Sequence, residues 1–84
     1  MEEKEIGKIT HYFGNINVGI IELSDALKVG EKIHVKGHTA DFTQDVSSME
    51  IEHVVVSEAK SGDAVGIKLS QKVHQNDRVY KVAA

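Results

Sequence analysis

The chain has 84 residues with ten basic and thirteen acidic side chains, a formal net charge of −3 when histidine is neutral. This length suits one small domain, expected to span residues 1–84. The acidic charge argues against a general nucleic-acid clamp, whose affinity comes from many phosphate contacts. No cysteine is present, which excludes disulfides and thiolate zinc sites.

The first residues, MEEKE at 1–5, are polar and are expected to form a frayed terminus. No basic start followed by an apolar stretch predicts a secretory signal. No apolar run approaches the roughly 20 residues that cross a bilayer. Together with the absence of cysteine, these features predict a cytoplasmic protein without membrane contact.

Apolar residues then alternate with a period of two, which predicts strands rather than helices. Around residues 8–13, Ile9 and Phe13 are predicted to point to one face and Tyr12 to the other. The alternation continues through residues 16–23, but its phase changes between Ile20 and Ile21, which predicts a bulge there. Runs at 32–36 and 42–46 flank the letters GHT, which predict a hairpin reversal.

The second half continues with apolar runs at 49–51, 65–69 and 79–82. GEKI at 30–33, GDAV at 62–65 and NDRV at 76–79 each place a turn residue and an acid ahead of a β-branched residue. Glycine and asparagine tolerate positive φ, so these tetrads predict a turn leading into a strand. The fold class is therefore predicted as all-β, a small closed antiparallel barrel of six or seven strands. Its predicted interior comprises Ile9 or Phe13, Ile33, Val35, Val46, Ile51, Val65, Ile67 and Val79.

The sequence motifs give little support to a catalytic or metal-binding function. The five histidines show no HExxH or similar ligand spacing, so no metal site is predicted. Serine, histidine and aspartate are present without a nucleophile-elbow pattern, and neither an enzyme nor a cofactor is predicted. Asp63 to Gly66 matches the DxxG string of GTPases, but no GxxxxGK[ST] loop accompanies it. Nucleotide binding is therefore not expected.

Lys32, His34 and Lys36 alternate along one predicted strand and share its outward face. Such a basic stripe could contact phosphates. The alternative is the solvated outer face of a barrel strand. Only four side chains are tyrosine or phenylalanine, so a stacking platform for single-stranded nucleic acid is poorly supplied.

Three segments, LKVGE at 27–31, VSSMEIEH at 46–53 and AKSGDAVG at 59–66, occur in an order that resembles translational GTPases. The resemblance is to the second domain of elongation factor Tu and elongation factor one-alpha. The opening IGKITHYFGNINVGIIELSD is similar also to stand-alone elongation-factor-like proteins and to the C-terminal domain of collagenase-like peptidases. The resemblance to the translational GTPases implies a translation-factor-type barrel. In the elongation factors, this barrel holds the aminoacylated 3′ end of transfer RNA.

The resemblance also implies a ligand rim. Glu50 matches the family glutamate beside the terminal adenosine, and Val18 matches a valine of the same pocket. Ala64 stands where the family has an asparagine, and Lys68 stands where it has an apolar residue. Glu50 and Lys68 are accordingly predicted to be neighbours on one face, with their charged groups within reach of each other.

Two functions follow from these observations. The first is a non-catalytic binding module of the elongation-factor second-domain type, acting in protein biosynthesis on RNA or the transfer-RNA end. The alternative is a protein-interaction module that docks on a peptidase or on a translation-associated protein. Lys68 and the basic stripe favour RNA, whereas the net acidic charge favours a protein partner.

Overall fold

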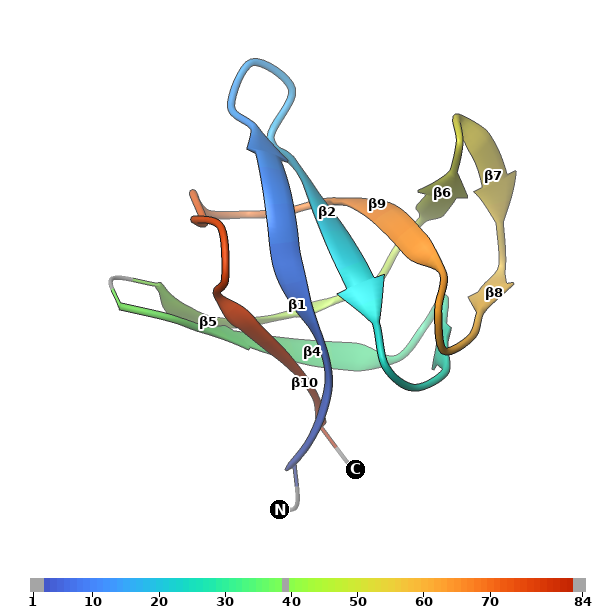
Figure 1. The fold of residues 1–84 in the computed structure, drawn as a ribbon, viewed down its shortest axis with the longest axis horizontal. Helices are drawn as coiled ribbons and strands as arrows, with labels where there is room; N and C mark the ends of the chain where they lie inside the picture. Colours follow the sequence, from blue (N-terminus) through green and yellow to red (C-terminus); the bar gives the residue numbers. More distant parts are fainter. Residues whose placement is uncertain (1–2, 39, 83–84) are drawn as a thin grey trace.

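The computed structural model describes residues 3–38 and 40–82, which form ten strands and no helix (Figure 1). The eight-stranded sheet has the order β5-β4-β10-β1-β2-β9-β6-β7, and β3 pairs with β8 in a second sheet. All pairings are antiparallel. The strands are β1 (Glu3–Phe13), β2 (Val18–Leu23), β3 (Leu27–Lys28), β4 (Lys32–Lys36), β5 (Asp41–Asp45), β6 (Met49–Ile51), β7 (Val54–Val56), β8 (Glu58–Ala59), β9 (Ala64–Lys68) and β10 (Arg78–Val82).

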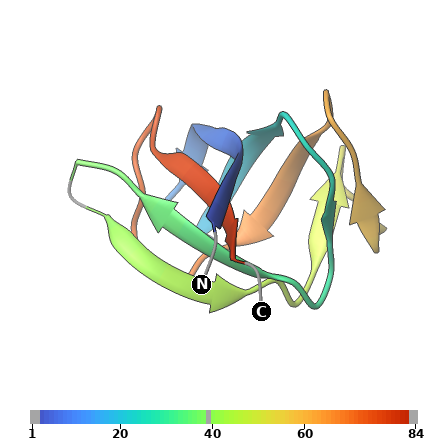
Figure 2. The same ribbon diagram turned by 90° about the horizontal axis from the view of Figure 1, so that it is seen from below.

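The all-β class is confirmed, but a closed barrel is not. The large sheet curls around the core (Figure 2) and ends at β5 and β7, and no ladder joins these two strands in the described part of the chain. Several strands have only two or three residues, which is why their number exceeds the six or seven predicted. Of the residues predicted to fray, Glu3 to Glu5 belong to β1 and pair with β10, and residues 1 and 2 lie outside the described range.

The core contains most of the predicted interior residues, because the inward positions of the strands carry β-branched side chains. Of the alternatives Ile9 and Phe13, Ile9 is the buried one, and Phe13 is 45% exposed. The prediction for Ile51 needs correction, because Ile51 is only partly buried against the core. Tyr12 packs on the core in place of Phe13. The confirmed interior residues are Ile9, Ile33, Val35, Val46, Val65, Ile67 and Val79.

A bulge at Thr10 explains the position of Phe13. Ile9 pairs with Ile21 whereas His11 pairs with Ile20, so β1 contains one residue more than β2 at this point. The extra residue reverses the facing of every later side chain of β1. The sequence predicted a bulge beside Ile20 and Ile21, but it lies on the partner strand.

The three turn tetrads are confirmed in detail. Gly30, Gly62 and Asn76 have φ angles of 98°, 94° and 74°. The acid that follows each of them accepts a hydrogen bond from the backbone N–H three residues earlier. The pairs are Glu31 with Lys28, Asp63 with Lys60 and Asp77 with His74, at 2.7, 3.0 and 2.9 Å. Each acid therefore caps the turn that it ends.

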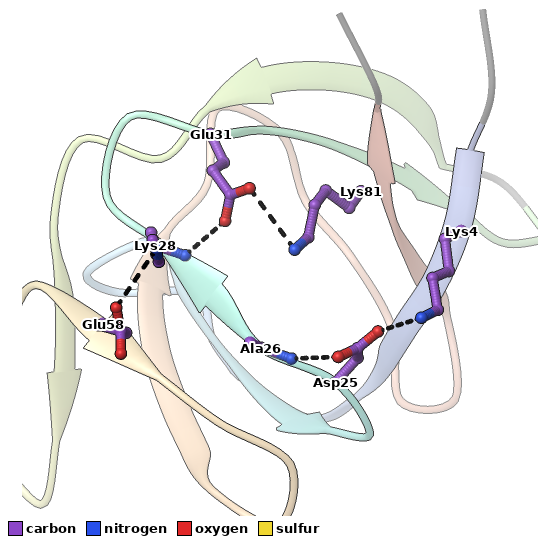
Figure 3. Close-up of polar contacts among 7 residues, drawn as sticks. All are labelled: Lys4, Asp25, Ala26, Lys28, Glu31, Glu58 and Lys81. Carbon is purple, nitrogen blue, oxygen red and sulfur yellow. Dashed lines mark hydrogen bonds and ion pairs between the residues drawn. The ribbon is translucent and has the colours of Figure 1, made fainter.

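Figure 3 shows how charged side chains attach the short β3 segment to its neighbours. Glu31 lies 3.5 Å from the Lys81 ammonium on β10, and Lys28 lies 3.6 Å from Glu58 on β8. Asp25, just before β3, accepts a hydrogen bond from Ala26 N and pairs with Lys4 of β1 at 2.5 Å. Surface pairs like these, with exposed or half-buried side chains, contribute little each, about 0–1 kcal/mol, so they mainly fix the position of the segment.

Candidate functional site

A groove of about 300 Å³ lies on the outer face of the large sheet. Its lining comes from the end of β1, the β1–β2 loop, strands β2, β6 and β9, and the β6–β7 turn (Figure 1). Apolar residues and one glycine form most of it, and two carboxylates and an imidazole complete it. The lining residues are Phe13, Ile16, Val18, Ile20, Glu50, Glu52, His53, Ala64 and Gly66.

The strand register explains why these residues meet. Ile20 pairs with Gly66, Gly66 with Glu50, and Glu50 with Val55, so one row of residues crosses β2, β9, β6 and β7. Residues that pair directly across a sheet present their side chains on the same face. Gly66 occupies the middle of the row without a side chain, and the groove passes over it.

The β6–β7 turn forms one edge of the groove. Glu52 and His53 have φ angles of 50° and 66°, the left-handed values that a two-residue hairpin of type I′ requires at both positions. Asparagine and glycine are the residues that usually fill such a turn. Glutamate and histidine take this conformation at a steric cost.

Three of the four predicted rim residues lie together: Val18, Glu50 and Ala64 all line the groove. Lys68 pairs with Val18 and lies two residues from Gly66 on β9, so it shares their outer face. It is not among the lining residues, and no ion pair joins it to Glu50 within the described residues. The shared face agrees with the expectation, and a binding role for these four residues stays a prediction.

The predicted phosphate-binding stripe has an acidic environment. Lys32 pairs with Asp45 and Lys36 with Asp41 across β4 and β5. Between them, the His34 ring contacts Asp41 through Nε2 and lies 2.7 Å from Glu3 Oε2 through Nδ1. The hydrogen bond with Asp41 raises the pKa of His34, burial of the ring opposes this rise, and the bond with Glu3 adds to it. His34 is therefore engaged by two carboxylates, which disfavours the predicted phosphate contact.

The lining residues that the sequence did not assign to the ligand rim are Phe13, Ile16, Ile20, Glu52, His53 and Gly66. The apolar alternation of residues 16, 18 and 20 is a signal for this surface as well as for a strand. In the structure Val18 and Ile20 face outward, because Gly19, Ile21 and Leu23 take the inward positions of β2. An alternating apolar run on the outer face indicates a surface that is covered or occupied.

No group of three or more histidine, cysteine or acidic side chains in the described part of the chain is arranged to hold a metal ion. The same residues include no helix long and apolar enough to span a membrane.

The chain is similar over most of its length to parts of larger proteins. It is 40% identical over 77 residues to an uncharacterized protease of Methanocaldococcus jannaschii, which covers 90% of this chain and 19% of that protein. It is 30% identical over 78 residues to a collagenase of Porphyromonas gingivalis, which covers 90% of this chain and 22% of that protein. The chain therefore spans about a fifth of the length of these relatives. No protein-family model matches it.

A solved structure confirms the fold. The C-terminal domain of a candidate U32 peptidase of Geobacillus thermoleovorans superposes with a TM-score of 0.89, over 95% of this chain and 93% of that one, at 14% sequence identity. The collagenase-like part of the resemblance is thereby supported. The prediction of a translation elongation factor-like protein in protein biosynthesis is wrong, because these relatives and this structure come from a protease, a collagenase and a peptidase.

Proposed function

We propose that the chain is a non-catalytic domain of a U32-peptidase-type protein, and that it docks on the larger catalytic part of that protein. The observation that carries the proposal is the match of 90% of this chain to 19% of the M. jannaschii protease. In such a relative the segment stands beside a much longer polypeptide. The solved structure supports the same assignment, because it is a C-terminal domain.

The groove supports docking more than catalysis. Its lining contains no hydroxyl or thiol side chain that could act as a nucleophile. Apolar side chains form most of its surface, as in surfaces that another molecule covers. For this reason we propose that the binding partner is a protein and not RNA. A cytoplasmic location and the absence of nucleotide binding stay predictions from the sequence.

A chimera tests the docking. In the M. jannaschii protease, this chain replaces the 77-residue segment that it matches. Hydroxyl-radical footprinting then compares the labelling rate of each exposed side chain in the chimera and in the isolated chain. We expect a contiguous set of side chains to react more slowly in the chimera. Equal rates throughout would show a tethered domain that does not dock.

The non-catalytic assignment has a separate test. The isolated chain, purified at high concentration, should leave casein and gelatin intact during long incubation. Hydrolysis that copurifies with the chain and is lost in a groove variant such as Glu50→Gln would overturn this part of the proposal.

A further inference from the structure

We infer that the groove and the β6–β7 hairpin are the docking surface, and that the partner inserts a bulky apolar side chain next to a lysine or arginine. This inference rests on the proposed docking function and specifies its surface and chemistry. Five features of the described residues carry it: the gathering of exposed apolar side chains, the glycine floor, the acidic edge, the free edge of β7 and the strained turn.

Exposed apolar side chains gather around the groove. Phe13 and Ile16 are 45% and 59% exposed and line it directly. Val55, 69% exposed, is the cross-strand neighbour of Glu50, and Val54, 62% exposed, follows the turn. The described residues include one further large apolar side chain of this kind, Val29. Phe13, Ile16 and Val55 thus lie at the groove or in the row that crosses it, whereas Val54 pairs with Ile51 and faces the other side of β7. Contiguous apolar surface of this kind marks an interaction site.

The floor of the groove is open backbone at Gly66. A Cβ atom built there would lie 3.4 Å from Val18 Cγ1 and 3.5 Å from Ile20 Cδ1, which is ordinary van der Waals contact. The strand would therefore accept a side chain at this position. Glycine weakens a strand interior, and a glycine at such a position often marks a close approach by another molecule. The missing side chain of Gly66 leaves room for that approach. An inserted apolar side chain would fill that room.

The edge of the groove is acidic. Glu50 and Glu52 lie among the lining residues, which include neither lysine nor arginine. Lys68, on the same outer face, is the cross-strand partner of Val18 and does not line the groove. Two carboxylates beside an apolar surface attract a cation and repel a phosphate. This charge favours a basic polypeptide segment over a nucleic acid.

Strand β7 offers the partner backbone contacts as well. It pairs with β6 and with no other strand in the described part of the chain, so one of its edges is available. An extended segment can add to such an edge through main-chain hydrogen bonds. The consecutive residues Val54, Val55 and Val56 have high strand propensity and no charge that would prevent this pairing.

The turn between β6 and β7 supports a binding role independently. Glu52 and His53 hold left-handed backbone where Asn-Gly would be less strained. Backbone strain of this kind is retained mainly where the side chains have a task. Both side chains lie at the groove, so recognition gives a reason for their presence in this turn.

Matched variants test the surface in the chimera described above. Gly66→Leu fills the floor, and the double variant Glu50→Lys/Glu52→Lys reverses the charge of the edge. Glu58→Lys on β8 reverses one charge outside the groove lining and is the control for such a replacement. Circular dichroism and thermal unfolding of the isolated chains verify that each variant folds.

We expect Phe13, Ile16 and Val55 to be labelled more slowly in the chimera than in the isolated chain, while Val29 is unchanged. In the chimera, Gly66→Leu and the double charge reversal should raise the labelling rate of these side chains to the rate seen in the isolated chain. Glu58→Lys should leave them protected. Protection at another surface, or protection that survives both groove variants, would overturn the inference while leaving the docking function intact.

If no side chain is protected, the docking function fails, and a peptide titration decides the inference by itself. The probe is a blocked nine-residue peptide with phenylalanine next to arginine, followed by amide NMR shifts of Ile20 and Gly66. The inference requires binding at least about tenfold tighter than that of two matched peptides, one with glutamate for arginine and one with alanine for phenylalanine. Equal or absent binding, shifts caused by adenosine monophosphate alone, or concentration-dependent shifts from a second copy of the chain would overturn it.

Discussion

Gln44 Oε1 accepts a hydrogen bond from the backbone N–H of Ser70 at 2.7 Å, and Gln44 Nε2 donates to Lys68 O at 2.9 Å. Gln44 lies on β5, at one end of the large sheet, whereas Lys68 and Ser70 belong to the end of β9 and the segment after it. No strand ladder connects these elements among the described pairings. One amide side chain therefore joins two parts of the sheet that backbone pairing leaves apart.

Replacing Gln44 should loosen this connection. Gln44→Ala removes two hydrogen bonds at a half-buried position and should lower the free energy of unfolding by about 1–2 kcal/mol. Gln44→Glu keeps the acceptor for Ser70 but loses the donor for Lys68, so its loss should be similar or larger. Chemical denaturation measures the change, with Thr43→Ala on the same strand as control. Equal stability of Gln44→Ala and the control would contradict this role.

His34 should make stability depend on pH. Its pKa is raised from 6.5 and that of Asp41 is lowered from 3.8, chiefly by the hydrogen bond between them. The His34 contribution is complete below its unfolded pKa and is lost as pH rises through the folded value. The Asp41 contribution is complete above its unfolded pKa and is lost as pH falls through the folded value. The stabilisation is therefore largest between about pH 4 and pH 6.5.

Denaturation midpoints of the natural chain and of His34→Gln, measured from pH 3 to pH 9, check this dependence. The difference between the two should be largest inside that window and should shrink toward both ends. His38→Gln, at an exposed position of the neighbouring turn, is the control and should show no such profile. A difference that grows above pH 7 would contradict the assignment.

Gly37 should tolerate no side chain while Asp77 is present. A Cβ atom on Gly37 would overlap the Asp77 carboxylate, which is 5% exposed and caps the turn at His74. Gly37→Ala should therefore cost about 1–3 kcal/mol, as overpacking does. In the Asp77→Ala background the same change should cost clearly less, because the overlap is gone. Gly66→Ala, with ordinary contacts only, is the matched glycine control. Additive costs in the double variant would argue against the overlap.

His53→Gly should stabilise the chain. The φ angle of 66° is left-handed, which costs an ordinary residue about 1–2 kcal/mol, whereas glycine adds unfolded-state entropy worth about 0.4–1 kcal/mol. A net gain of about 0.5–1 kcal/mol is expected and can be measured by chemical denaturation. Asn76→Gly is the comparison, because asparagine already tolerates its φ of 74° and should gain less. A loss of stability in His53→Gly would mean that the ring makes a compensating contact.

Local sequence patterns determined the strands, the turns and most of the core. Gly30, Gly62 and Asn76 each precede an acid that caps the turn. In each turn, the acid and the backbone N–H that it binds lie within one stretch of four consecutive residues. The inward positions of β4 and β9 follow from simple alternation, because a strand repeats every two residues. Such features depend on neighbours in the chain, so they can be recognised without the fold.

Tertiary pairing decided the rest. The bulge at Thr10 is defined by the register between β1 and β2, and it alone places Phe13 outside and Tyr12 against the core. The groove exists because Ile20, Gly66 and Glu50 meet across three strands that are far apart in the sequence. The bridge from Gln44 to Ser70 likewise joins residues 26 positions apart. Periodicity gives the spacing of side chains along one strand, but only the packing of strands against each other determines which faces meet.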